Sequence, residues 1–259
     1  MAVAERTVDR SVRDQVSAEE WQVRVDLAAV YRLVAYYGWD DQVFTHASAR
    51  VPGEDGTFLI NPFGLLFEEV TASNLVKVDR GGNTVLESDY EANTAGFVIH
   101  GGVLGARPDV NCVIHLHTAY GQAVSAQKQG LLPLTQTAMF LNGDVAYHDF
   151  EGTATDLEER QRLAADLGDK NCLILRNHGT LTVGTHMADA FSRIYFLERA
   201  CKSQILAQSG GVDLTTPSEE AVMRSASLAQ GGLGQGYAER LTWPALIRKM
   251  DRLDAGYRE

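Results

Sequence analysis

Two histidines lie two positions apart in the apolar run Cys112-Val113-Ile114-His115-Leu116-His117. Alternate residues of a β-strand point to the same face, so His115 and His117 would project side by side, with Ile114 and Leu116 opposite. Two imidazoles on one rigid face can bind zinc, iron, manganese, cobalt or nickel. The alternative is a pair of polar residues that face water on a half-exposed strand. Because a strand this apolar is expected to be central, where imidazoles need partners, we favour the metal site.

His178 is the natural third ligand, because it ends another apolar run within the turn Asn177-His178-Gly179. Gly179 can adopt a positive φ there and redirect the backbone. A lone histidine in such a turn is more often structural, and that alternative stays open. Three histidine ligands leave an open coordination position, which is typical of a catalytic metal site. The sequence therefore predicts one divalent ion per subunit on His115, His117 and His178.

The remaining histidines leave several roles open. His100 lies on a glycine-rich helix before the His-x-His strand, where it could act in catalysis, support the ligands or be a hydrogen-bonded core residue. His46 and His148 lie in loop-like contexts and could line the pocket, whereas His186 is expected at the surface. The run Asn61-Pro62-Phe63-Gly64 could offer backbone amides to an anion, or could be a plain turn.

The elements that must position these residues alternate irregularly between helix and strand. Apolar periodicity and stop signals predict helices up to Gly38, at 94–106, at 121–128, up to Gly168, at 188–208 and around Trp243. The helix that Gly168 ends would begin at the capping box Thr155-Asp156-Leu157-Glu158. Short apolar or alternating segments predict strands at 43–51, 57–61, 111–118, 172–176 and 180–183. Hairpin-like turns, such as 79–83, favour an α/β fold with a mixed or antiparallel central sheet.

The chain reads as a single domain over residues 1–259, because no linker or internal repeat interrupts it. A polar lead-in is expected at 1–18, a core at about 25–208 and a polar, glycine-rich tail at 210–259. The three cysteines, Cys112, Cys172 and Cys201, lie among apolar neighbours. An odd number of such cysteines favours reduced thiols and a cytoplasmic location.

The charge of the chain excludes two classes of partner. Its 34 acidic and 23 basic residues give a formal net charge of −11, which opposes binding to phosphate backbones and to anionic membranes. No apolar run approaches the roughly 20 residues that cross a bilayer. We therefore expect neither nucleic acid nor a membrane as a partner.

Several motifs together resemble the class II aldolase/adducin family over about residues 25–208. The resemblance is carried by six segments: Thr45-His46-Ala47-Ser48-Ala49-Arg50, Ile60-Asn61-Pro62-Phe63-Gly64, Ala95-Gly96-Phe97-Val98-Ile99-His100, Arg107-Pro108-Asp109, His115-Leu116-His117-Thr118 and Asn177-His178-Gly179. It implies a three-layer α/β/α sandwich with a mainly antiparallel sheet, and a homotetramer with active sites between subunits. It also implies a divalent ion on the three matching histidines, zinc first, with manganese or iron as alternatives.

The chain departs from the family's sugar-phosphate aldolases where they bind phosphate and transfer protons. The glutamate that those aldolases use as ligand and acid/base would fall at Gly96. Their phosphate-binding asparagine aligns with His46, and a threonine of the second loop aligns with Phe63. Their catalytic tyrosine would fall near Gln136, where the chain has no tyrosine.

The leading hypothesis is a metal-dependent lyase that cleaves a carbon–carbon bond by decarboxylation or retro-aldol reaction. The substrate would be a small, unphosphorylated carboxylate or hydroxy-carbonyl compound, and a metal-stabilised enolate would be the intermediate. His46, His100 or His148 would supply the proton in place of the missing glutamate. The candidate substrate-binding residues are Asn61, Gly64, Phe97 and Gln136.

Two alternatives remain open. A non-haem iron oxygenase could use the same three histidines, since neutral ligands leave positions for dioxygen and substrate. The other is a non-catalytic interaction module such as adducin, against which the three retained histidines speak.

Overall fold

The computed structural model describes residues 11–152, 158–230 and 236–259 of the chain. Its centre is a seven-stranded sheet of the order β3-β2-β1-β4-β7-β6-β5. The strands are β1 (His46–Arg50), β2 (Phe58–Ile60), β3 (Val76–Val78), β4 (Cys112–Leu116), β5 (Val145–His148), β6 (Cys172–Leu175) and β7 (Gly179–Gly184). Neighbouring strands pair antiparallel, except that β5 and β6 are parallel. The expected mainly antiparallel α/β fold is confirmed.

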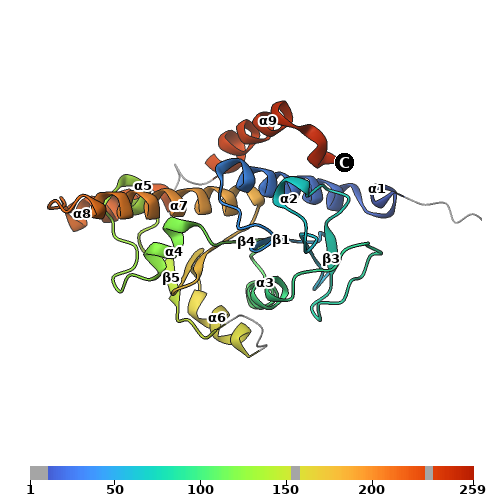
Figure 1. Ribbon diagram of the computed structural model, residues 1–259, viewed down its shortest axis with the longest axis horizontal. Helices are drawn as coiled ribbons and strands as arrows, with labels where there is room; N and C mark the ends of the chain where they lie inside the picture. The colour runs from blue at the N-terminus through green and yellow to red at the C-terminus, as the bar shows by residue number, and fades with distance from the viewer. Residues whose placement is uncertain (1–10, 153–157, 231–235) are drawn as a thin grey trace, which may run out of the picture.

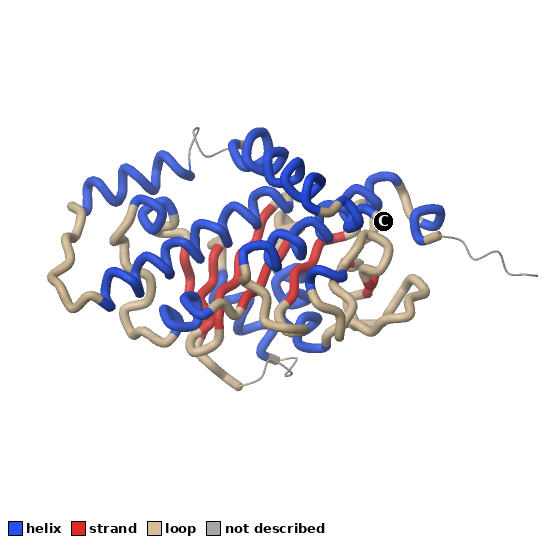
Figure 2. Tube along the Cα trace, turned by 45° about the horizontal axis from the view of Figure 1, so that its top comes forward, coloured by secondary structure: helices blue, strands red, loops and turns tan. Residues whose placement is uncertain are grey.

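Helices cover both faces of this sheet (Figure 1). The two long helices, α2 (Ala18–Tyr37) and α7 (Met187–Ser209), lie on one face, and α3 (Thr94–Ala106) and α6 (Glu159–Leu167) lie on the other. Figure 2 shows the strands running side by side behind the two long helices. The sheet therefore forms the middle layer of three.

The shorter elements surround these layers. They are α1 (Val12–Gln15), η1 (Phe67–Glu69), α4 (Ala119–Ser125), α5 (Gln136–Phe140), α8 (Glu219–Gln230), the π-helical η2 (Ala238–Thr242), α9 (Trp243–Leu253) and η3 (Ala255–Arg258). α9 lies on the outer side of α2 (Figure 1). None of the helices in the described ranges is long and apolar enough to span a bilayer.

The apolar core consists of two clusters, one on each face of the sheet. The alternation of β4 explains the division, because Ile114 and Leu116 pack with α2 and α7, whereas Val113 packs with Ile99 and Val103 of α3. His115, which lies on the same side of the strand as Val113, is 1% exposed. The side chains that alternate along the sequence around His115 and His117 therefore alternate between the two faces of a buried strand.

Several expected boundaries agree with the structure. Gly38 follows α2 with φ +66°, Gly168 follows α6 with φ +54°, and α3 spans the expected residues. The capping box expected at Thr155-Asp156-Leu157-Glu158 includes residues 155–157, which lie outside the described part of the chain. All three cysteines are buried free thiols, as expected.

Other expectations were wrong. His46 and His148 do not lie in loops, because His46 begins β1 and His148 ends β5, and both are buried. The strand expected from residue 43 begins only at His46, since Thr45 has φ +66°. The polar lead-in and tail are not among these errors, although the lead-in contains α1 and the tail contains α8, which buries only Val222 and Ala226.

Tyr31 of α2 makes hydrogen bonds to β1 and to the residue that follows β2. Its hydroxyl accepts hydrogen bonds from the Ala47 N–H at 2.7 Å and the Asn61 N–H at 3.2 Å, and it contacts the Ala47 carbonyl oxygen. The side chain is fully buried. One hydroxyl therefore satisfies backbone groups of both β1 and the loop after β2.

Removal of this hydroxyl is expected to destabilise the fold. Tyr31→Phe would leave buried N–H groups without an acceptor, which costs about 1–3 kcal/mol. Urea unfolding of Tyr31→Phe and of the control Tyr36→Phe, whose ring is 47% exposed, measures the difference. The control should change the free energy of unfolding by less than about 0.5 kcal/mol. Equal values for the two variants would contradict this role of Tyr31.

Candidate metal centre

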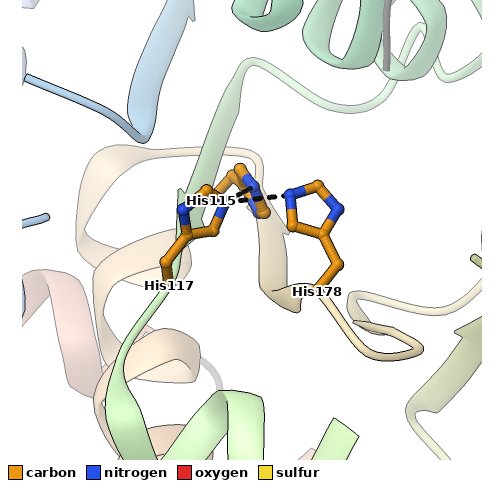
Figure 3. A group of neighbouring side chains, drawn as sticks. All are labelled: His115, His117 and His178. Carbon is orange, nitrogen blue, oxygen red and sulfur yellow. Dashed lines mark hydrogen bonds between the residues drawn. The ribbon is translucent and has the colours of Figure 1, made fainter. Parts of the chain in front are cut away.

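Three histidine side chains from two neighbouring strands point at one another at one edge of the sheet (Figure 3). His115 and His117 come from β4 and the residue after it, and His178 from the turn before β7. The Nε2 of His117 lies 3.0 Å from the Nε2 of His115 and 2.9 Å from the Nε2 of His178. One ligand atom from each residue lies within 4.8 Å of the others. The structure therefore brings together the three residues that the sequence singles out.

In His115 and His117, the ring nitrogen that points away from the cluster has a hydrogen-bond acceptor, which fixes the position of its proton. The Nδ1 of His115 lies 3.0 Å from the carbonyl oxygen of Thr180, and the Nδ1 of His117 lies 3.1 Å from Oδ2 of Asp41. A carbonyl and a carboxylate can only accept, so Nδ1 carries the hydrogen in both rings. In the neutral rings, both Nε2 atoms then carry lone pairs. Hydrogen bonds of this kind orient metal-binding histidines.

Burial favours the neutral form of the His115 and His178 rings, which is the form that binds cations. It is the main cause that lowers the pKa of His115 well below its usual value, and neighbouring imidazoles, His178 foremost, lower it further. Burial first, and then His117 and His148, lowers the pKa of His178 to about 4. At neutral pH these two rings thus present lone pairs rather than positive charges.

The donor set fits a divalent ion. Two lone pairs that face each other at 3.0 Å repel, and a cation to which both point turns the repulsion into attraction. Tetrahedral zinc at about 2.0–2.1 Å from each nitrogen separates its ligand nitrogens by roughly 3.3 Å, which small rotations of the rings provide. His115 is buried and His117 and His178 are half-buried, so an ion here would be open to substrate on one side.

A second histidine pair lies beside this cluster. The Nδ1 of His46 lies 2.9 Å from the Nε2 of His100, whose Nδ1 lies 2.6 Å from the Ser48 hydroxyl. The rings of His46 and His115 have centroids 5.1 Å apart, because the two residues are partners in the β1–β4 register. Burial is the main cause that lowers the pKa of both His46 and His100, followed by the imidazole of His100 for His46 and by that of His115 for His100.

Gly96 leaves the room that the His46 ring occupies. A Cβ atom at Gly96 would lie 2.7 Å from Cδ1 of Ile60 and 3.0 Å from two atoms of the His46 ring. The position where the sugar-phosphate aldolases would have glutamate therefore faces His46. A larger residue at 96 and the imidazole at 46 compete for the same space.

His148 is held by α6. Its Nδ1 donates a hydrogen bond to Oδ2 of Asp166 at 2.7 Å, and its Nε2 lies 3.6 Å from Oε1 of Glu159. Both ring nitrogens of His148 therefore face carboxylates of α6. This geometry favours a structural role for His148 over a catalytic one.

The candidate substrate-binding residues are dispersed. Asn61 is fully buried, and its Nδ2 is among the described side-chain atoms without a hydrogen-bond partner, while Gly64 has φ +97° in the following loop. The Phe97 ring stacks under the Arg160 guanidinium at 4.0 Å. Asn61 and Gly64 belong to the loop after β2, and Phe97 belongs to α3.

Gln136 lies away from the histidines of its own chain. It lines a groove with Asp144 and Asn171, the residues that precede β5 and β6. His178 comes shortly after the other end of β6. The groove and the histidine cluster therefore lie at opposite ends of the strands.

Sequence reasoning missed Asp41, Ser48 and Thr180. Asp41 is one of two adjacent aspartates in the loop after α2, and nothing in its sequence context distinguishes it from an exposed loop residue. Ser48 could have been found, because it follows His46 by two positions on the same strand face. The role of Thr180 depends on its carbonyl group, which carries no sequence signal.

Comparisons with known proteins agree on one family. Residues 25–205 match the family model described as the Class II Aldolase and Adducin N-terminal domain. The chain is 52% identical to an aldolase II superfamily protein from Pseudomonas syringae, whose crystal structure matches with a TM-score of 0.91 over 96% of this chain and 100% of that one. It is 30% identical to an L-fuculose 1-phosphate aldolase from Glaciozyma antarctica PI12, with a TM-score of 0.81 over 93% and 94% of the two chains. It is 43% identical to mouse alpha-adducin over 249 residues, which are 91% of this chain and 34% of that protein.

Loss of the Asp41 carboxylate is expected to weaken metal binding. Asp41→Asn removes the charged acceptor of the His117 Nδ1–H, and such changes cost about 10–100-fold in affinity. Chelator competition with zinc measures the affinity. Asp40→Asn removes the same charge from the neighbouring, exposed residue and serves as the matched control. Equal affinities for the two variants would show that Asp41 does not orient His117.

Glutamate at position 96 is expected to be tolerated only when the ring at position 46 is gone. Gly96→Glu should lower the free energy of unfolding by about 1–3 kcal/mol through overpacking. Adding His46→Asn should recover part of that loss. Gly105→Glu is the control, because a Cβ at Gly105 meets no atom within 4 Å. Strictly additive effects of Gly96→Glu and His46→Asn in urea unfolding would contradict the competition for space.

Proposed function

The chain belongs to the class II aldolase and adducin family, and from this premise we propose that it is a metal-dependent lyase that cleaves a carbon–carbon bond. The reaction would be a decarboxylation or a retro-aldol cleavage of a small carboxylate or hydroxy-carbonyl substrate. The observation that carries the proposal is the convergence of the Nε2 atoms of His115, His117 and His178, two of which have their outward nitrogens fixed.

The chain's own residues would divide the work between holding the ion and admitting the substrate. His115, His117 and His178 would bind one divalent ion, with zinc as the first choice and manganese or iron as alternatives. When bound, the ion supplies a Lewis acid that polarises a carbonyl or carboxylate oxygen of the substrate. The half-buried side of the cluster, near the exposed ring of Phe150, would admit the substrate, because this ring lies 6.4 Å from the ring of His178.

His46 is our candidate for the proton-transferring group. The contacts Ser48 Oγ to His100 Nδ1 and His100 Nε2 to His46 Nδ1 form a chain in which each hydrogen can lie on either side. In one arrangement the Nε2 of His46 carries a hydrogen, and in the other it carries a lone pair. His46 can thus donate or accept a proton at Nε2 while Ser48 and His100 take up the change. His100 is fully buried and would act through His46.

The side chains of His46 and Phe63 favour an unphosphorylated substrate. The Nδ1 of His46 is engaged by His100, and Phe63, which is 44% exposed, adds an apolar ring beside Gly64. Phe63 offers a phosphate group no hydrogen-bond donor, and His46 offers at most one N–H, at Nε2. The L-fuculose 1-phosphate aldolase to which the chain is similar has a phosphorylated substrate in its name, and we propose that the present substrate differs in this respect.

A subunit interface is part of the proposal. Gln136 lies at the opposite end of the strands from the histidines of its own chain, so it could contribute to a site only in a neighbouring copy. We propose a homotetramer in the cytoplasm, with the histidine cluster close to a contact between subunits.

The 43% identity to alpha-adducin favours one second candidate, a module that binds proteins without catalysis. The two candidates differ in what the histidine cluster must do. A lyase needs a stoichiometric metal, whereas an interaction module does not.

Elemental analysis of the purified full chain, followed by assays without oxygen, tests the proposal. We expect about one zinc or manganese per chain, and turnover of a member of a panel of 2-oxo acids, aromatic ortho-hydroxy acids and hydroxy-aldehydes. His115→Ala should lose both metal and turnover, whereas His186→Ala, whose side chain is 59% exposed, should lose neither. A metal-replete preparation without bound metal would favour the interaction module. Iron with strictly oxygen-dependent turnover would replace the lyase by an oxygenase.

Replacement of His46 should separate proton transfer from metal binding. His46→Gln keeps a polar side chain of similar size but cannot exchange a proton, so turnover should fall about 100- to 10,000-fold. The metal content should stay that of the wild type, because His46 is not among the three clustered ligands. Unchanged turnover in His46→Gln would remove His46 from the mechanism.

A further inference from the structure

Glu198 is a buried carboxyl group on α7 that the proposed reaction does not use. The residue is 3% exposed. Its Oε1 accepts a hydrogen bond from the Thr180 hydroxyl at 2.8 Å, and its Oε2 accepts one from the Thr118 hydroxyl. No cation pairs with it within the described part of the chain. Because an unpaired buried carboxylate is costly compared with an apolar side chain, its presence calls for a task beyond packing.

Both threonines belong to the segments that carry the histidine cluster. Thr118 directly follows His117, and Thr180 comes two residues after His178. The carbonyl oxygen of Thr180 also accepts the hydrogen bond from the Nδ1 of His115. One carboxylate thus contacts the threonine that follows His117 and the threonine whose carbonyl oxygen accepts from the His115 ring.

The space around the carboxylate is closed. A Cβ atom at Gly121 would lie 2.8 Å from the Thr118 hydroxyl oxygen and 3.1 Å from Oε1 of Glu198. The Thr118 oxygen already accepts the Gly121 N–H at 3.0 Å, where it caps the start of α4, so its own hydrogen is free for Glu198. The carboxylate, the two hydroxyls and the start of α4 therefore have fixed relative positions.

We propose that Glu198 is a positioning residue of the histidine cluster. Its carboxylate holds Thr118 and Thr180 so that the backbone keeps the rings of His115 and His117 aimed at one point. Binding groups must stay within about 0.5 Å and 10–20° of their productive geometry, a tolerance that a rotation of the Thr180 carbonyl would exceed. The inference rests on the metal-binding part of the proposed function.

Cobalt binding to the full chain tests this role without any substrate. Glu198→Gln keeps the size of the side chain but turns one acceptor into a donor that faces a hydroxyl. We expect the affinity for Co²⁺ to fall about 10–100-fold, together with a shift of the visible Co²⁺ absorption band, because the ligands are reoriented. Thr180→Val, which removes one of the two hydroxyls, should act in the same direction. Thr180→Ser keeps the hydroxyl and should behave as the wild type does.

Gln204→Met provides the matched structural control. Gln204 is a 1% exposed residue of the same helix, and it donates to the Gly130 carbonyl oxygen instead of contacting the histidine segments. This variant should lose stability but keep the wild-type Co²⁺ affinity and spectrum.

The outcomes separate the inference from the proposed function. If the wild type binds Co²⁺ and Glu198→Gln binds it with the same affinity and spectrum, Glu198 is structural only and the inference is wrong. If the wild type binds no Co²⁺ or Zn²⁺, the proposed function fails and the inference fails with it. Should Glu198→Gln not fold, the comparison of Thr180→Val with Thr180→Ser decides the question by the same measurements.

Discussion

The antiparallel pairing of β4 with β7 is the interaction on which the site depends. It places Leu116 opposite Thr180, and so sets His117, just beyond the end of β4, beside His178, just before the start of β7. The same pairing puts the Thr180 carbonyl within reach of the His115 ring. A shift of one residue in this register would turn His115 to the other face of the sheet and separate the three rings. The α2 and α7 layer on one face and α3 and α6 on the other hold the register by burying both faces of β4.

Burial gives the cluster its chemical character as well as its geometry. Five imidazoles gather at this edge of the sheet, and a charge on any of them would be both desolvated and repelled by its neighbours. Burial therefore lowers the pKa of His46, His100, His115 and His178 and favours the neutral form of these four rings. Three of them can bind a cation, and His46 with His100 forms a separate hydrogen-bonded pair that can carry a proton. Metal binding and proton transfer would thus be assigned to adjacent but distinct groups.

The convergence of His115, His117 and His178 could be predicted from the sequence, because it follows from local rules. The period of two in a strand places His115 and His117 on one face, and the Asn-His-Gly turn presents His178. The expected positive φ at Gly179 was wrong, because Asn177 takes the left-handed conformation in this turn, with φ +56°. The same rules gave α3 its limits and α2 its end at Gly38. Partners that come from distant segments could not be predicted, since Asp41 reaches His117, and Glu198 reaches Thr118, only through the tertiary fold. His148 was misplaced because β5 is the last strand of the sheet and its first three residues are only half-buried, so no compact apolar run marks it in the sequence. The sequence showed that Gly96 stands where the sugar-phosphate aldolases would have glutamate. It did not show that the His46 ring occupies that space.

X-ray absorption at the zinc edge of the zinc-loaded protein tests the central claim most directly, because it counts and identifies the atoms bound to the metal. We predict three imidazole nitrogens at about 2.0–2.1 Å, with oxygen ligands from solvent completing the shell. The imidazole scattering should decrease by one ligand in His178→Ala and stay unchanged in His148→Ala. A first shell dominated by carboxylate oxygen or by sulfur, or the same imidazole count in both variants, would contradict the three-histidine centre.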